Sequence, residues 1–230
     1  MTTANAVMLS IIIPTLNDGH RLAATLQRLS AYEDPREIII SDGGSTDQTF
    51  ALTAKAGGKF YMAPTGRGQQ LAMGADVSVG DWMLFLHADT KLGPGWVTAV
   101  NRFMENPDNR FRAGYFMFAL DDPAPRARRL EQMVAWRCRT FSLPYGDQGL
   151  LISRAMYERL GGFSAIPLME DVDLIRRIQN HRLECLPALA ITSAQRYQQD
   201  GYVIRPLKNL LCLALFMVGV SPRIINDFYR

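Results

Sequence analysis

Short apolar runs alternate along the first half of the chain with polar loops and with stretches of helical periodicity. We expect four strands, at residues 9–13, 37–40, 59–62 and 82–86. Apolar residues recur at helical spacing after the first three runs, which predicts helices at residues 20–29, 48–56 and 69–77. Strands separated by helices imply right-handed crossovers and a mostly parallel sheet. The sequence therefore predicts an α/β fold in which every strand-to-helix loop lies on the same edge.

The run at residues 82–86 is apolar throughout, and the chain turns polar directly after it, at His87 and Asp89. Such a run is typical of a strand that is buried on both faces of a parallel sheet. Ligands of open α/β sheets bind beyond the carboxyl ends of the strands. Asp89 is therefore the first candidate for chemistry. A carboxylate that only caps the next segment is the open alternative.

Polar side chains from all four strand ends are expected at this edge, namely Thr15, Asn17, Asp18, Asp42, Ser45, Asp47, Arg67, His87 and Asp89. Carboxylates together with an arginine and backbone amides suit a ligand with phosphates and hydroxyls, especially one that brings a divalent cation. Loops are polar in any protein, so only the convergence of the four loops supports a binding site.

Familiar phosphate-binding motifs are absent from the sequence. It contains neither G-x-G-x-x-G nor G-x-x-x-x-G-K-[ST], so neither a dinucleotide fold nor a P-loop is supported. The pairs Gly43-Gly44 and Gly66-x-Gly68 are more simply turn glycines, needed for positive φ or for close approach of helix and strand. That role leaves room for amides that face a phosphate.

The second half of the chain has a different pattern. We expect helices at residues 96–104, 123–141 and 154–160, strands at 112–120 and 150–153, a helix that opens at 169–173, and a helical, mostly apolar tail at 205–230. Three acidic residues at the start of the helix at 169–173 are explained by the helix dipole alone. A role in chemistry for any of them needs other support.

Two surfaces of the second half have open interpretations. The helix at 123–141 carries Arg126, Arg128, Arg129, Arg137 and Arg139. A solvated helix face is the simpler explanation for this run, and contact with anionic lipid headgroups or an anionic acceptor is the alternative. For the apolar tail, packing on the domain or against a second subunit is the default, and a membrane interface is the rival.

Composition narrows the class of protein. A chain of 230 residues with 48% hydrophobic and 20% charged residues is long and apolar enough for one globular domain. The net charge of +3 is too small to argue for nucleic acid as a partner. Three widely spaced cysteines show no metal-type pairing, which argues against a zinc site or a disulfide framework and favours a reduced, cytoplasmic setting.

Membrane insertion is not expected from the sequence. The N-terminus lacks the positive charge of a signal peptide. The apolar stretch at residues 210–220 has about half the length needed to cross a bilayer. Peripheral contact with the inner face of the membrane, through residues 126–139 and 206–220, stays open.

Four segments taken together resemble the family 2 glycosyltransferases. These are residues 11–17, 41–47, 85–90 and 169–171, and their order and spacing match that family between about Leu9 and Ile178. The variant tip His87-Ala88-Asp89, together with residues 146–149 and 193–197, is most similar to a small bacterial branch, the radical-SAM/selenodomain-associated transferases.

The resemblance implies a GT-A (Rossmann-like) fold, with a mostly parallel sheet, flanking helices and a helical C-terminal tail. It divides the chain into one catalytic domain at 1–203 and the tail at 204–230. Residues 1–92 would form the nucleotide-binding half of the domain and residues 93–203 the acceptor half. The implied donor is a UDP- or GDP-linked sugar, the implied metal is manganese or magnesium, and transfer would invert the anomeric carbon.

Site residues are carried over from the family by position. Those implied in nucleotide-sugar binding are Pro14, Thr15, Asn17, Asp42, Gly43, Ser45, Arg67, His87 and Ala88. Asp89 would bind the metal and Asp171 would be the catalytic base, while Gly146, Asp147, Gln148 and Glu170 would contact the donor sugar or the acceptor. His87 replaces the first aspartate of the usual tip, so metal binding rests more heavily on Asp89. The Q-x-x-R-W signature of processive enzymes is absent, which disfavours a polymer synthase.

The chemistry of transfer is consistent with these roles. A metal at Asp89 would neutralise charge on the leaving diphosphate, with help from Arg67, and a carboxylate on the opposite side would take the acceptor's proton. A nucleotidyltransferase is the alternative enzyme, although residues 14–18 lack the glycines and lysine expected there. A degenerate nucleotide-sugar binding module is the non-enzymatic alternative. The sugar, the acceptor (a lipid or a small molecule) and a homodimer stay open.

Overall fold

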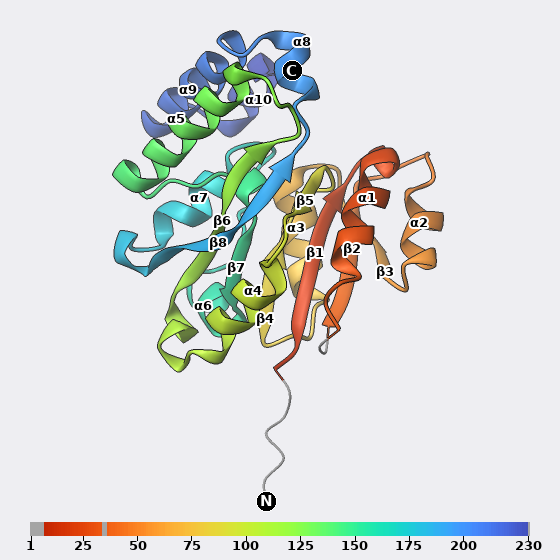
Figure 1. Cartoon of the computed structure of the whole chain (residues 1–230). Helices are drawn as coiled ribbons and strands as arrows, with labels where there is room; N and C mark the ends of the chain where they lie inside the picture. The colour runs from red at the N-terminus through yellow and green to blue at the C-terminus, as the bar shows by residue number, and fades with distance from the viewer. Residues whose placement is uncertain (1–6, 34–35, 230) are drawn as a thin grey trace, which may run out of the picture.

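A computed structural model describes residues 7–33 and 36–229, which form a mixed sheet between layers of helices (Figure 1). The strands of the described residues are β1 Leu9–Thr15, β2 Arg36–Asp42, β3 Lys59–Met62, β4 Trp82–Phe85, β5 Thr90–Leu92, β6 Ala113–Leu120, β7 Leu150–Ser153 and β8 Leu183–Thr192. Their order in the sheet is β3-β2-β1-β4-β7-β6-β8-β5.

The helices lie on both faces of the sheet and at one end of it. They are α1 Gly19–Leu29, α2 Thr49–Lys55, α3 Arg67–Asp76, α4 Trp96–Glu105, α5 Pro125–Phe141, α6 Arg154–Arg159, α7 Glu170–Arg177, α8 Gln195–Asp200, α9 Ile204–Met217 and α10 Pro222–Tyr229. Short 3-10 turns are η1 Pro107–Phe111, η2 Gly146–Gln148 and η3 Asn180–Arg182.

The first half of the chain confirms the predicted parallel arrangement. β1 pairs in parallel with β2 and β4, and β2 pairs in parallel with β3. Successive residues of β1 point to opposite faces, so Ile11 and Ile13 join one core cluster, with α1 and α4, and Ile12 joins another, with α3 and α7. This two-sided burial explains why the strand is apolar at every position. The loops after β1, β2 and β4 consequently meet at one edge.

Two strands, β5 and β8, were missed by the sequence analysis. β8 pairs in parallel with β6 and antiparallel with β5, while β7 joins β4 and β6 by antiparallel pairing. In the β6–β8 register Leu186 lies opposite Phe116 and Leu189 opposite Met117, so Pro187 falls in an irregularity of the ladder. A proline has no amide to donate, and such a position tolerates it. β5 has three residues and gives no periodic signal.

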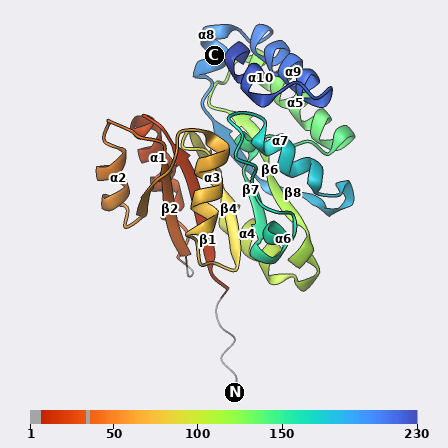
Figure 2. The same cartoon turned by 180° about the vertical axis from the view of Figure 1, so that it is seen from behind.

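The predicted helical tail is confirmed, but it is two helices instead of one. α9 ends at Met217, and α10 begins at Pro222 after Gly219, which has a φ of 87°. Figures 1 and 2 show α5, α8, α9 and α10 gathered at one end of the molecule, beyond the ends of β6 and β8. One continuous sheet joins the two predicted halves of the domain, and the division itself stays a prediction.

Candidate active site

The loops that follow β1 and β2 are held together by the carboxylate of Asp42. This side chain is fully buried, and its Oδ1 accepts hydrogen bonds from the hydroxyls of Thr15, at 2.9 Å, and Ser45. Its Oδ2 accepts from the backbone amides of Gly44, at 2.9 Å, and Ser45, at 2.6 Å. The amide of Asn17 in turn donates to the Ser45 hydroxyl at 2.7 Å. Asp42 therefore fixes the shape of both loops from the interior.

Other residues predicted to hold the nucleotide lie around this network. Pro14 is buried within β1. Gly43 is covered by Gln70, because a Cβ at this position would lie 3.1 Å from Gln70 Nε2. Asn17 is exposed and left-handed, with a φ of 53°, and its side-chain oxygen accepts from the amide of Thr46 at 2.8 Å. The structure thus brings this predicted set together, with Asn17 at its solvent side.

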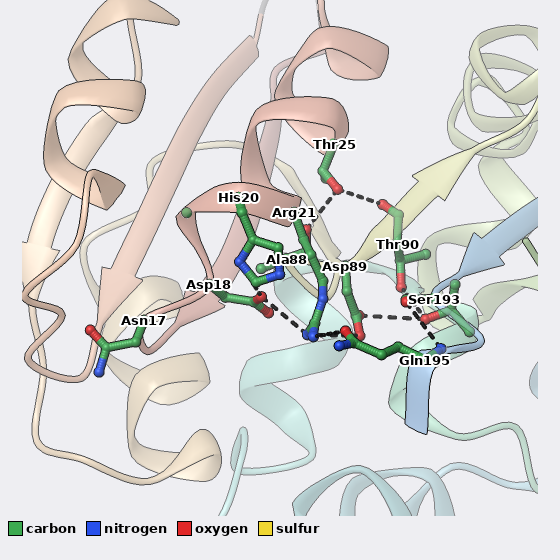
Figure 3. Close-up of polar contacts among 12 residues, drawn as sticks. Asn17, Asp18, His20, Arg21, Thr25, Ala88, Asp89, Thr90, Ser193 and Gln195 are labelled. Carbon is green, nitrogen blue, oxygen red and sulfur yellow. Dashed lines mark hydrogen bonds and ion pairs between the residues drawn. The ribbon is translucent and has the colours of Figure 1, made fainter. Parts of the chain in front are cut away.

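The carboxylate of Asp89, beyond the end of β4, lies among polar side chains from α1 and α8 (Figure 3). Arg21 of α1 places Nη1 3.1 Å from Asp18 Oδ1 and 4.0 Å from Asp89 Oδ2. Its Nη2 donates to Gln195 Oε1 at 2.6 Å. Arg21 therefore links the first helix of the chain to α8 beside the carboxylate predicted to bind metal.

The other two residues of the tip have different environments. Ala88 is buried, and its backbone oxygen accepts a 2.8 Å hydrogen bond from Thr25 Oγ1, which anchors the tip to α1. His87 is half-buried. Burial and the nearby Arg67 lower the pKa of His87 to about 4, against the opposing effect of nearby carboxylates. The imidazole is therefore neutral at pH 7.

A cavity of about 110 Å³ lies between the β4 tip, η2, the start of α7 and the C-terminal helices. Five residues from the predicted set line it, namely Arg67, His87, Asp89, Asp147 and Asp171. The residue predicted to bind metal and the residue predicted to be the base therefore face the same space.

Asp171 is held in place by two backbone amides. Its Oδ2 accepts from Gly146 at 2.7 Å, and its Oδ1 accepts from Val172 at 2.7 Å, in the first turn of α7. Gly146 lies so close to the β4 tip that a Cβ added to it would be 2.7 Å from His87 Nε2. A larger residue at this position would therefore displace the His87 side chain, where η2, the tip and Asp171 meet. Each carboxylate oxygen keeps lone-pair capacity for a ligand in the cavity.

The neighbours of Gly146 in η2 differ in role. Burial raises the pKa of Asp147 to about 6, and its Oδ1 is enclosed without a hydrogen-bond partner among the described residues. Gln148 is buried away from the cavity, where its Nε2 donates to the backbone oxygen of Phe116 at 3.1 Å and its Oε1 accepts from Arg137 at 3.2 Å. Asp147 therefore faces the cavity, while Gln148 holds η2 against β6.

Glu170 is fully buried and forms a short ion pair with the guanidinium of Arg67. Burial raises the pKa of Glu170 and the positive charge of Arg67 opposes that rise. Burial acts to lower the pKa of Arg67, but the Glu170 and Asp171 carboxylates raise it above its usual value. The second oxygen of Glu170 has no partner within the described residues. Glu170 consequently contacts Arg67 and does not line the 110 Å³ cavity. Its predicted contact with the donor sugar or the acceptor stays a prediction.

The cavity offers few protein ligands for a divalent metal ion. No cluster of three or more histidine, cysteine, aspartate or glutamate side chains with metal-binding geometry occurs in residues 7–33 and 36–229. Asp89 offers a half-buried carboxylate at the cavity, and Mg²⁺ is commonly bound by one or two carboxylates with substrate phosphates. The residues therefore fit a metal that is held jointly with a diphosphate.

The sequence analysis missed the contribution of the C-terminal segments to this cavity. Arg196, Tyr197, Arg205, Asn209 and Tyr229 line it. The Oδ1 of Asn209 is buried without a hydrogen-bond partner in the part of the chain that the structure describes. The polar residues Arg205 and Asn209 interrupt the apolar tail four residues apart, which is one turn of a helix, and this spacing was the available signal.

The sequence is similar to those of known glycosyltransferases. A family model described as Glycosyl transferase family 2 matches residues 10–160. A PGL/p-HBAD biosynthesis glycosyltransferase of Mycobacterium bovis is 38% identical over 95 residues, which cover 38% of this chain and 37% of that protein. An N-acetylglucosaminyl-diphospho-decaprenol L-rhamnosyltransferase of Mycobacterium tuberculosis is 23% identical over 218 residues, covering 74% of this chain and 70% of the relative.

Solved structures show the GT-A fold. Glucosyl-3-phosphoglycerate synthase from Mycobacterium tuberculosis, in complex with Mn²⁺, UDP and glucosyl-3-phosphoglycerate, superposes with a TM-score of 0.57 at 17% identity. The match covers 81% of this chain and 70% of the synthase chain. S. aureus TarS 1-349 superposes with a TM-score of 0.63 at 14% identity, covering 96% of this chain and 69% of that one. The predicted fold class is therefore confirmed.

Proposed function

Since the chain belongs to glycosyl transferase family 2, we propose that it transfers a sugar from a nucleotide-diphosphate sugar to an acceptor hydroxyl, with inversion at the anomeric carbon. The observation that carries this proposal is the shared cavity of Asp89 and Asp171. Asp89 would bind the metal and the donor's diphosphate, and Asp171 would take the proton of the acceptor hydroxyl. The finer resemblance to the radical-SAM/selenodomain-associated branch stays a prediction.

The donor would lie across the strand ends from β2 to β4. The network around Asp42 would present Asn17 and the loop amides to the base and ribose, and the diphosphate would approach Asp89. A divalent cation bound by Asp89 and the diphosphate would neutralise the charge that develops on the leaving group. Support for UDP and manganese comes from the glucosyl-3-phosphoglycerate synthase complex. GDP and magnesium are retained as alternatives.

Transfer would use Asp171 as the base. The acceptor oxygen attacks the anomeric carbon as the bond from that carbon to the diphosphate oxygen breaks, and Asp171 takes the acceptor's proton. The two amides on Asp171 orient its carboxylate, and the remaining lone pairs face the cavity. Arg67 lines the cavity with its charge partly neutralised by Glu170, so it would give modest electrostatic help.

The acceptor would enter beside the C-terminal helices, where Arg205, Asn209 and Tyr229 form a wall of the cavity. The rhamnosyltransferase relative has a decaprenol-linked substrate in its name, and the synthase structure contains glucosyl-3-phosphoglycerate. We retain a lipid or a small molecule as acceptor for this chain. A cytoplasmic location and a homodimer stay predictions.

Release of nucleotide tests the proposal without knowledge of the acceptor. Purified protein is incubated with UDP- and GDP-sugars and Mn²⁺ or Mg²⁺, and free nucleoside diphosphate is measured, because slow transfer to water is expected. Asp89→Ala should abolish the release. If native protein binds a nucleotide sugar but never releases the diphosphate, alone or with hydroxyl acceptors, the chain is the binding module considered above. Release of pyrophosphate from a nucleoside triphosphate would instead favour a nucleotidyltransferase, an alternative that family membership disfavours.

A further inference from the structure

Helix α9 is apolar on its outer side as well as on the side that packs against the domain. Its inward positions include Arg205 and Asn209, which line the cavity, and the fully buried Cys212. Further along the helix, Leu213, Leu215 and Phe216 pack against the same buried cluster as Cys212. Its exposed positions are apolar, with exposed fractions of 66% for Ile204 and 58% for both Leu207 and Leu210. Leu211 is 47% exposed and Met217 is 53% exposed. A helix that packs on a core normally turns its apolar residues inward. The outer face of α9 therefore has no partner within the described chain.

Helices α5 and α10, at the same end of the molecule, also expose apolar residues. Ile224 and Phe228 of α10 are 63% and 50% exposed, and Met133 and Trp136 of α5 are 59% and 56% exposed. Both views of the molecule show α5, α9 and α10 together at one end, beyond the sheet (Figures 1 and 2). Scattered exposed apolar residues are ordinary, but a cluster over three adjacent helices is a mark of an interaction surface. We call these exposed residues of α5, α9 and α10 the apolar end face.

Positive charge accompanies the apolar end face. Arg129 and Arg139 on α5 and Arg223 on α10 are exposed and form no ion pair among the described residues. Arg126 is exposed too, and its nearest carboxylate oxygen, on Asp122, is 4.0 Å away. Unneutralised arginines beside exposed aliphatic and aromatic side chains match the surface of a bilayer that contains anionic lipids.

Helix dimensions favour a position along the membrane. No described helix is both long enough and apolar enough to span a bilayer. The 14 residues of α9 extend about 21 Å. Because one side of α9 packs on the domain and the other exposes Leu207, Leu210 and Leu211, the helix suits an orientation in the plane of the interface.

We propose that the apolar end face docks on an anionic lipid bilayer, with α9 lying in the interface. Charge complementarity selects this occupant over a second copy of the chain, because a symmetric contact would bring the unpaired arginines of two copies together. A bilayer with acidic headgroups would bury the apolar end face and also neutralise those arginines. Docking does not depend on the proposed transfer reaction, so either can fail without the other.

Vesicle flotation tests the docking. Native protein should float with phosphatidylserine–phosphatidylcholine vesicles at low salt, and the bound fraction should fall at high salt or with phosphatidylcholine alone. The double substitution Leu207→Glu with Leu211→Glu should weaken binding at least tenfold. Met62→Glu is the matched control, because Met62 is 63% exposed on β3, away from this face, and it should leave flotation unchanged.

A second pair of variants separates charge from apolar contact. Arg129→Ala with Arg139→Ala should weaken binding by about 25-fold, at the usual contribution of each arginine near an anionic membrane. Arg28→Ala with Arg102→Ala removes the same charge from exposed positions on α1 and α4 and should have little effect. Circular dichroism of each variant checks folding.

The proposal is overturned if native protein stays at the bottom with anionic vesicles at low salt. It is also overturned if the folded double variant, Leu207→Glu with Leu211→Glu, floats with the vesicles as well as native protein does. A native dimer in gel filtration that the two glutamates convert to monomer, with no flotation, would identify a second copy as the occupant instead.

Discussion

Two hydrogen bonds define the position of Asp171, one from Gly146 of η2 and one from Val172 of its own helix. This arrangement orients the carboxylate toward the cavity without neutralising its charge. Asp173, two residues further along α7, points elsewhere, since it pairs with Arg177 at 2.7 Å and accepts from Ser164 at 2.7 Å. The two aspartates of one helical turn therefore provide a test and its control.

We predict that Asp171→Asn lowers transfer by about a hundredfold or more, because the amide cannot accept the proton. The side chain keeps its size and one of its two amide contacts, so nucleotide binding should stay near the native value. Initial rates of nucleotide release and calorimetric affinities measure the two effects. Asp173→Asn should retain transfer. Near-native transfer by Asp171→Asn would reduce Asp171 to a helix-terminal charge, and Asp147 would become the next candidate for the base.

Asp147 provides a pH-dependent prediction. Burial raises its pKa from 3.8 to about 6, so the folded state holds this proton more tightly than the unfolded state. The resulting stability is fully present below about pH 4 and is lost as the pH rises through about 6. Asp147→Asn has no such loss. We therefore expect the Tm of Asp147→Asn, relative to native protein, to increase between pH 4 and pH 7. A Tm difference that is constant over this range would contradict the buried, protonated carboxyl.

Individual site residues were predictable from the sequence where they follow a strand. His87 and Asp89 come directly after the apolar run of β4, and the topology of a parallel sheet places them at the ligand edge. Arg205, Asn209 and Tyr229 could not be found in this way, because they come from helices whose docking depends on tertiary contacts. Resemblance implied contacts with the sugar or the acceptor for Gln148 and Glu170. In the fold their side chains bond to Phe116 and Arg67, and the implied contacts stay predictions.

Among the elements, α3 is the one whose position depends most on a glycine. A Cβ on Gly68 would lie 2.4 Å from the backbone oxygen of Ser164 and 2.6 Å from that of Ile166. These oxygens belong to the segment that leads into α7, which carries Glu170 and Asp171. Close contact at Gly68 therefore lets α3 bring Arg67 to Glu170.

We predict that Gly68→Ala destabilises the protein by about 1–3 kcal/mol, the usual cost of overpacking, despite the better helix propensity of alanine. Chemical denaturation measures this change in the free energy of unfolding. Gln69→Ala, at the next position of α3, is the matched control and should be close to neutral. Equal stability of Gly68→Ala and native protein would mean that the segment at 164–166 moves aside freely.

The elements that the sequence failed to predict have identifiable reasons. Burial alternates along β8 from Cys185 to Thr192, but exposed positions such as Pro187 and Leu189 are apolar too. The sequence therefore shows no polar–apolar alternation, and pairing with β6 makes the segment a strand. β1, β2 and β4 were predictable because burial on both faces leaves an unbroken apolar run. The break of the tail into α9 and α10 was signalled by Gly219 and Pro222. The sequence did not indicate which side of each helix packs on the domain and which side is exposed.

At the scale of the whole molecule, one sheet carries the loops at the ends of β1, β2 and β4, where we propose that the donor binds. The C-terminal helices line the cavity on the side where we propose that the acceptor enters. Arg21 joins the two sides through its contacts with Asp18, Asp89 and Gln195. Nucleotide and metal would thus bind where segments distant in sequence meet. The central claim is that Asp89 serves the donor and its metal, whereas Asp171 acts only in transfer.

Calorimetric titration of UDP and GDP, with and without Mn²⁺, into native protein and the two variants tests this claim most directly. We predict that native protein binds one of these nucleotides more tightly with Mn²⁺, and that ligand at about a hundred times Kd stabilises it by about 2.7 kcal/mol. Asp89→Ala should lose the metal-dependent part of the affinity, and Asp171→Asn should keep it. Native protein that binds neither nucleotide with Mn²⁺ or Mg²⁺, or an Asp89→Ala variant with unchanged metal dependence, would contradict the account.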